Sequence, residues 1–138
     1  MSWDVIMIRT KNNNEPPDSI SDDMLVPFTQ TEIIMKLKKI SEYINAGYDF
    51  SDPSWQIMTA DNWSVEFNIG DGDEAAAIML CIRGNNEPTE LLKEIAIEFG
   101  TRLLDGSNGE FIDFTHPTCF DAYKAYRDKI FGGSENTK

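Results

Sequence analysis

The sequence is poor in the residues on which enzyme chemistry most often depends. Its 138 residues include a single histidine, His116, and two cysteines, Cys81 and Cys119. The cysteines lie in apolar surroundings without CxxC or Cys/His spacing, which indicates buried thiols rather than a disulfide or a zinc site. No GxGxxG, P-loop, HExxH or GxSxG motif is present. We therefore expect no metal and no cofactor, and the pattern favours a non-enzymatic protein without excluding an enzyme.

Long apolar runs are also missing. The longest run, 75–82, is far too short to span a bilayer. The first residues lack the basic leader, apolar stretch and cleavage site of a signal peptide. Together with the reduced thiols, these absences predict a cytoplasmic protein that has no membrane partner.

Positive charge is scarce, with 12 basic residues against 24 acidic ones and a net charge of −12. Such a chain repels phosphate backbones, so we expect no nucleic acid partner. No lysine or arginine occurs between Lys39 and Arg83. If the acids of this stretch share one face, that face would attract a basic protein partner; a solvated surface that only aids solubility is the simpler alternative. The candidate partner contacts are Asp49, Asp52, Asp61, Glu66, Asp71 and Asp73.

The length and the 41% hydrophobic content predict one globular domain, 1–133, followed by a frayed tail, 134–138. Asn, Asp and Pro crowd the segment 11–27, which we interpret as a long polar loop that is either functional or mobile. The sequence leaves the oligomeric state open.

Strands are predicted where apolar and branched residues alternate or cluster between turn residues. Alternation is strict in 63–69, which predicts an antiparallel strand with one dry and one wet side. Both faces of 76–83 are apolar, so this strand should be central with cover on each side. The first strand should also be central or nearly so. The predicted strands are 3–9, 55–59, 63–69, 76–83, 102–105 and 110–114.

Three helices are predicted from capping residues and apolar periodicity. The first follows a capping-box pattern from Thr29 to Glu32 and should end at Gly47. The second opens at Pro88 and closes at Gly100, and the third follows Pro117. The order β-α-β-β-β-α-β-β-α predicts an α+β domain with a mainly antiparallel sheet of about five to six strands and three helices.

The acidic segment 70–74 lies between two predicted strands that share the two-residue period of a β-strand. Glycine and aspartate tolerate the backbone of hairpin loops, so turn geometry accounts for every residue there. A calcium loop of the EF-hand kind would need further oxygen ligands, but three alanines follow. We interpret segment 70–74 as a turn.

One catalytic arrangement remains as an alternative. Cys119 stands three residues after His116, and Asp113 three residues before it, so a small hydrolase-like enzyme could use these three groups. A thiol at a helix N-terminus gains a lowered pKa.

The run "WSVEFNI", a buried strand ending in "IRG", a helix and "LLDGSNGEFIDF" resemble small acidic bacterial α+β proteins of the polymorphic-toxin immunity type and neighbouring uncharacterised families. The resemblance covers roughly 63–114. It implies a protein that lacks catalytic residues and blocks a toxin by direct contact, and it assigns no individual residue a role.

Overall fold

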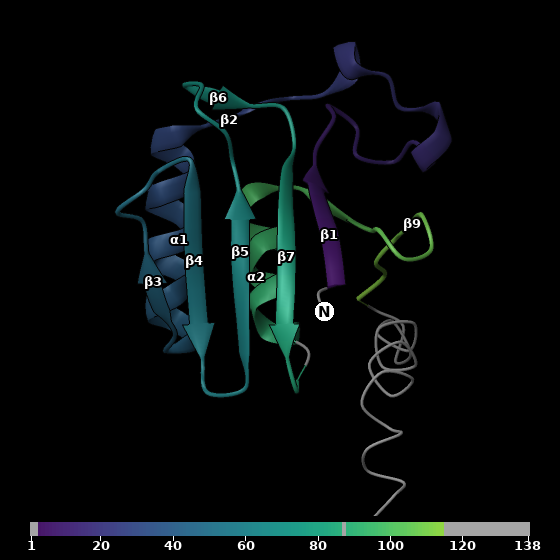
Figure 1. The fold of residues 1–138 in the computed structure, drawn as a ribbon. Coiled ribbons are helices and arrows are strands. Elements are labelled where there is room, and N and C mark those ends of the chain that lie inside the picture. The colour runs from purple at the N-terminus through teal and green to yellow at the C-terminus, as the bar shows by residue number, and fades with distance from the viewer. Residues whose placement is uncertain (1–2, 87, 115–138) are drawn as a thin grey trace, which may run out of the picture.

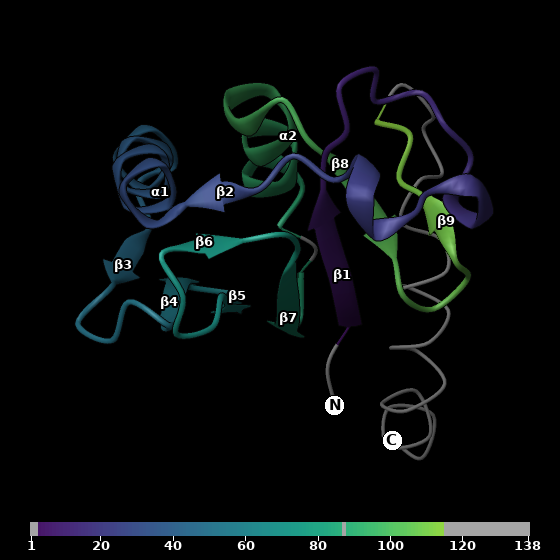
Figure 2. The same cartoon turned by 90° about the horizontal axis from the view of Figure 1, so that it is seen from above.

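The strands of this protein form a seven-stranded sheet that two helices cover on one face (Figures 1 and 2). The structure is a computed structural model that describes residues 3–86 and 88–114. Its elements are β1 (Trp3–Ile8), the 3-10 helices η1 (Pro17–Ser19) and η2 (Asp22–Met24), β2 (Phe28–Thr29), α1 (Gln30–Ile44), β3 (Gly47–Asp49), β4 (Trp55–Ala60), β5 (Trp63–Asn68), β6 (Glu74–Ala75), β7 (Ile78–Gly84), α2 (Thr89–Phe99), β8 (Arg102–Asp105) and β9 (Glu110–Phe111).

The strands are ordered β3-β4-β5-β7-β1-β8-β9, and every neighbouring pair is antiparallel. The α+β class and the mainly antiparallel sheet are thereby confirmed, as is the inner position of β1, which pairs with both β7 and β8. The predicted count of five to six strands is wrong. The main sheet has seven, and β2 and β6 form a separate two-stranded sheet. The described residues hold two α-helices, and the predicted third helix lies outside them.

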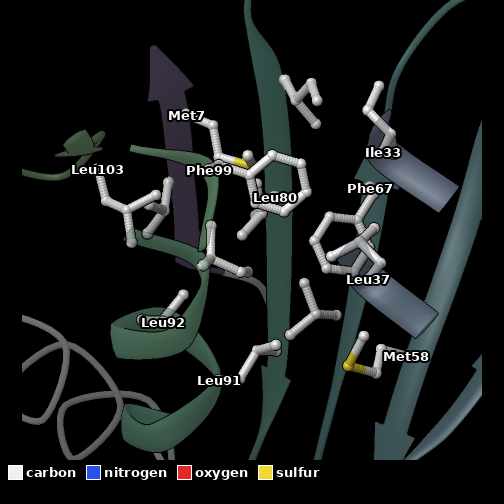
Figure 3. Close-up of a cluster of buried hydrophobic side chains, with 14 of the residues drawn as sticks. Met7, Ile33, Leu37, Met58, Phe67, Leu80, Leu91, Leu92, Phe99 and Leu103 are labelled. Carbon is white, nitrogen blue, oxygen red and sulfur yellow. The ribbon is translucent and has the colours of Figure 1, made fainter. Parts of the chain in front are cut away.

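The core lies between the two helices and the sheet, and Figure 3 shows its side chains meeting there. The inner strands β1, β4, β5, β7 and β8 contribute residues to this face, because successive side chains of a strand point to opposite sides. Helix α1 contributes residues spaced three or four apart, such as Ile33 and Leu37, and α2 contributes Leu92 and Phe99. Burying these side chains is the main source of stability of the fold.

The two described helices cover one face of the sheet, and no helix of residues 3–86 and 88–114 covers the other, so the cover predicted on both sides of the central strand is found on one side only in this part of the chain. β7 does lie in the middle of the sheet, and its Leu80 is completely buried. On its other face, however, Met79 is 41% exposed and Cys81 is half-buried. Both described helices follow connections that return over the same face, and this choice of side is not encoded in the alternation of a single strand.

Helix α1 begins as predicted but ends earlier. The hydroxyl of Thr29 accepts a hydrogen bond from the backbone N–H of Glu32, as an N-cap should. The helix ends at Ile44, and Asn45 takes the left-handed conformation (φ 61°) that closes it. Gly47, which we predicted to end the helix, instead begins the edge strand β3.

In a capping box the side chain of Glu32 would accept a hydrogen bond from the backbone N–H of Thr29. Here the Glu32 carboxylate forms an ion pair instead. The carboxylate of Glu32 accepts two hydrogen bonds from the guanidinium of Arg9, at 2.7 and 2.8 Å, and one from Lys36 at 2.7 Å. Arg9 also donates to the carbonyl oxygens of Val26 and Phe99. The end of β1, the start of α1, the end of α2 and the segment 11–27 are therefore joined at one guanidinium group.

Three short strands were missed, and one predicted strand is shorter than expected. β2 and β6 have two residues each and β3 has three, so none of them shows a full period of alternation. The predicted strand 110–114 forms a ladder only over Glu110–Phe111. Segment 11–27, predicted as a loop, contains the two 3-10 helices and pairs with the end of β1 through Thr10 and Leu25.

Candidate functional site at one end of the sheet

Four of the six predicted contact acids lie at the same end of the sheet. Asp49 ends β3 and Asp52 lies in the loop to β4, while Asp71 and Asp73 lie in the connection from β5 to β6. Because β4 and β5 are antiparallel, the loop before β4 and the connection after β5 meet at one end. All four side chains belong to exposed residues. We refer to these four residues as the acidic end.

Hydrogen bonds hold the two acidic segments together. The backbone N–H groups of Ile69 and Gly70 both donate to the carbonyl oxygen of Ser54, each at 3.0 Å. On the other side, the N–H of Gln30 donates to the carbonyl oxygen of Asp73 at 3.0 Å, and β6 pairs with β2. The connection therefore lies against the first turn of α1, where unpaired N–H groups and the helix dipole favour negative charge.

The first two acids are also set in place by their own loops. One carboxylate oxygen of Asp49 accepts hydrogen bonds from the N–H (3.0 Å) and hydroxyl (2.7 Å) of Ser51. In the same way, one carboxylate oxygen of Asp52 accepts hydrogen bonds from the N–H (3.1 Å) and hydroxyl (2.7 Å) of Ser54. The bonds from Ser51 lower the pKa of the Asp49 carboxyl below its usual value. Asp49 thus stays ionised at neutral pH and is held by its neighbours.

The negative charge of the acidic end is not neutralised by the described part of the chain. None of the four carboxylates forms an ion pair with a residue in 3–86 or 88–114. The absence of lysine and arginine between Lys39 and Arg83 contributes to this, because no neighbouring strand or loop of that stretch supplies a cation. Within the described residues the acidic end is therefore exposed and has no positively charged partner.

The other two predicted contacts lie elsewhere. Glu66 lies in β5 on the face opposite the helices, and its carboxylate is 2.8 Å from the guanidinium of Arg83. Its charge is therefore balanced within the protein. Asp61 lies in the turn between β4 and β5, at the opposite end of the sheet from the acidic end. The expectation of a single acidic face applies to four of the six residues.

Asp61 lines a polar cavity of about 380 Å³. The cavity lies between the β4–β5 turn, the end of α1 and the start of α2, and its walls include Ile44, Asn62, Trp63 and Glu90. The first N–H groups of α2 would favour an anion there. Two carboxylates, those of Asp61 and Glu90, oppose that tendency. The cavity contains no histidine, cysteine, serine or lysine that would support catalysis.

Sequence reasoning missed the exposed apolar side chains beside the acidic end. Trp55 is 45% exposed and Met79 is 41% exposed, and both lie on the face of the sheet without helices. The sequence of 55–59 gave no signal for this arrangement, because polar Gln56 lies on the buried face with Met58, while apolar Trp55 and Ile57 lie on the other face. We did not expect an uncovered face, since both faces of β7 are apolar.

The alternative catalytic group is only partly described. Cys119 and His116 lie outside the described residues, and Asp113 is an exposed residue shortly after β9. Among described residues the only free cysteine is Cys81. Burial and a hydrogen bond with Asp4 raise the pKa of its thiol, which makes it a poor nucleophile at neutral pH. The described chain therefore holds no activated cysteine.

The described residues offer neither a metal site nor a membrane-spanning helix. No group of three or more histidine, cysteine or carboxylate side chains is placed to hold a metal ion in 3–86 and 88–114. The acidic end itself is spread over two loops. No described helix has the length and apolar character needed to cross a bilayer.

Comparison with protein-family models, with curated proteins and with solved structures finds no significant match to this chain.

Proposed function

We propose that this protein is a non-enzymatic binding protein whose acidic end contacts a basic protein partner. The observation that carries the proposal is the placement of four exposed carboxylates, from two separate parts of the chain, at one end of the sheet, where none has an ion-pair partner among residues 3–86 and 88–114. Charge of this kind raises the rate at which an oppositely charged partner associates and helps to select it from other proteins.

The local geometry supports a binding role for this surface. Asp49 and Asp52 are already held by hydrogen bonds from Ser51 and Ser54, so less side-chain freedom is lost on contact with a partner. Each carboxylate keeps its second oxygen for further acceptor bonds. Lysine and arginine side chains form their strongest hydrogen bonds with such ionised acceptors. A basic protein surface therefore fits the site better than a neutral one.

An immunity-type role is the specific form of this proposal that the sequence resemblance implies. In that form the basic partner is a toxin, and contact with the acidic end blocks its activity. The cytoplasmic location predicted from the sequence agrees with such a role, because an immunity protein of this type meets its toxin inside the cell. Co-expression with the captured partner tests it directly: growth restored by the wild-type protein supports the immunity role.

The test of the binding role neutralises the acidic end and compares it with an equal change elsewhere. The test variant replaces Asp49, Asp52, Asp71 and Asp73 with asparagine, which keeps the acceptor oxygens for the serine bonds. The control replaces the exposed acids Asp18, Glu42, Glu90 and Glu110 with their amides. Both variants change the net charge from −12 to −8, since four negative charges are removed. Any difference between them therefore reports position rather than total charge.

Affinity capture is then run from the native cell extract at low and at high salt. We expect a basic protein to be captured by the wild type and the control variant, to be lost with the test variant, and to be released by salt because exposed charges are screened. Capture that is equal for both variants, or indifferent to salt, would contradict the proposal.

A further inference from the structure

The uncovered face of the sheet carries an apolar patch beside the acidic end. Trp55 and Met79 are large apolar side chains that are 45% and 41% exposed on this face. Ile57, which is half-buried, lies on the same face of β4 as Trp55, because the two are separated by one residue. We refer to Trp55, Ile57 and Met79 as the open-face patch.

The register of the sheet aligns the members of this patch. Trp55 of β4 pairs with Asn68 of β5, and Asn68 pairs with Met79 of β7. Residues paired across an antiparallel sheet share a face, and neighbouring strands are about 4.8 Å apart, so the backbones at Trp55 and Met79 are about 10 Å apart. The amide of Asn68 donates to the carbonyl oxygen of Met79 at 3.4 Å and so lies low between them. The two large side chains therefore flank a shallow surface.

Two residues of the acidic end, Asp49 and Asp52, adjoin this patch. Asp49 of β3 pairs with Ile57 of β4 and so shares its face of the sheet. The N–H of Trp55 donates to the carbonyl oxygen of Asp52 at 3.1 Å, which places that aspartate one turn before the tryptophan. A ligand seated on the acidic end would therefore extend over the open-face patch.

We propose that the open-face patch binds apolar side chains of a cationic segment in the basic partner, while the acidic end binds the lysine and arginine side chains of the same segment. This inference rests on the proposed function and names the chemistry of the partner. Tryptophan and methionine are enriched at protein interfaces, and a few such anchors contribute most of the binding energy. The acids set the charge of the partner, and the patch sets the apolar content of the bound segment.

Charge also argues against a second copy of this chain as the occupant. A second copy carries the same net charge of −12. Pairing the open faces would bring two acidic ends close together, where like charges repel. A cationic segment reverses the sign of that interaction and leaves the apolar contact in place.

The test compares two synthetic peptides of equal length and equal positive charge. One contains lysine and leucine and the other contains lysine and serine, and both carry a fluorophore for anisotropy titration. We expect the leucine peptide to bind the wild-type protein about tenfold more tightly, a difference typical of one good apolar anchor. Trp55→Ser should remove most of this preference and leave the affinity for the serine peptide within about twofold. Met79→Ser provides a second variant with the same expectation.

Ile97→Ser serves as the matched control, because Ile97 is 72% exposed on α2 and lies on the helix side of the molecule. It should leave both affinities unchanged. Far-ultraviolet circular dichroism checks that each variant is folded. A preference that survives both Trp55→Ser and Met79→Ser would overturn the inference, since the anchors would then lie elsewhere.

The outcomes separate this inference from the proposed function. Equal affinity for the two peptides, both weakened by neutralising the acidic end, would overturn the inference and retain the proposed function. No binding of either peptide would count against both. Light scattering that shows a dimer dissociated by Trp55→Ser would assign the patch to a second copy. Fluorescence of Trp55 in the free protein can be isolated by comparison with Trp55→Phe. If acrylamide does not quench this fluorescence, the patch would be assigned to this chain's own residues 115–138. Either result would overturn the inference.

Discussion

The indole N–H of Trp3, in the first strand, donates a 2.8 Å hydrogen bond to a carboxylate oxygen of Asp105, at the end of β8. The two residues are 102 positions apart in the chain, and both are buried. The same oxygen accepts the N–H (2.8 Å) and hydroxyl (2.7 Å) of Ser107. This one oxygen atom therefore joins the start of the chain to the turn between β8 and β9.

Removing this acceptor should destabilise the protein. Asp105→Ala removes the acceptor oxygen to which the buried indole N–H of Trp3 and the N–H of Ser107 donate, and we expect a loss of about 2–3 kcal/mol in the free energy of unfolding, measured by urea denaturation. The matched control is Asp49→Ala, which loses the same pair of serine bonds at an exposed site and should cost less than about 1 kcal/mol. Equal losses in the two variants would contradict the role of burial.

The Arg9–Glu32 pair should make stability depend on acid. Hydrogen bonds from Arg9 lower the pKa of Glu32 from 4.5 to about 2 in the folded protein. Because the folded-state pKa is lower than the unfolded one, the stabilisation is complete above about pH 4.5 and is lost as the pH falls toward 2. Glu32→Gln should remove this part of the pH dependence and lower the free energy of unfolding at pH 7 by about 2 kcal/mol, allowing for solvent screening at this half-buried pair.

An exposed ion pair provides the comparison. Lys39 and Glu98 are 3.0 Å apart, but the lysine side chain is 70% exposed. Glu98→Gln should therefore change stability by less than about 0.5 kcal/mol at any pH between 2 and 7. Thermal melts of both variants across that range would test the contrast. If the melting temperature of the wild-type protein does not change across that pH range, Glu32 does not couple folding to proton binding.

Gly84 should tolerate no side chain. Its φ is +127°, and a Cβ atom there would lie 2.3 Å from the carbonyl oxygen of Asn62 and 2.6 Å from the Cα of Trp63. Both are backbone atoms of the adjoining strand region and cannot move aside cheaply. Gly84→Ala should cost about 3 kcal/mol or more. Gly100→Ala, at φ +56° with open space around it, should cost only about 1 kcal/mol in the same denaturation experiment.

Tyr48 and Gln56 should be energetically coupled. The hydroxyl of Tyr48 donates to the side-chain oxygen of Gln56, which is completely buried. Burial also raises the pKa of the Tyr48 phenol, so it stays protonated and remains a donor. Tyr48→Phe should cost about 1–2 kcal/mol because it leaves a buried acceptor unpaired. In the double variant with Gln56→Leu the two losses should not add, and strict additivity in the double-mutant cycle would contradict the coupling.

The longer elements could be predicted because each carries at least one full structural period. Alternation marked β5, capping residues marked α1, and Pro88 with Gly100 bracketed α2. The short strands β2, β3 and β6 could not be predicted, since two or three residues show no period and form strands only when a partner pairs with them. The end of α1 was misplaced because Asn45 took the left-handed position that we assigned to Gly47.

The negative charge of the candidate site could be predicted from the sequence, but the residues that form the site could not. The chain itself determines that the stretch between Lys39 and Arg83 carries acid and no base. Which of those acids meet depends on the antiparallel return of β5 beside β4, which brings Asp49 and Asp71 to one end and sends Asp61 to the other. Glu66 was removed from the set by its pairing with Arg83 on the next strand.

The amino-acid sequence by itself determined the fold class, the long elements and the excess of negative charge, because these depend on composition and on periods within a few neighbouring residues. The tertiary structure alone decided that both described helices cover the same face, that Trp55 and Met79 stay exposed on the other, and that four acids lie at one end of the sheet. Those features depend on strand order and on the side to which each connection returns, and contacts between residues far apart in the chain set both.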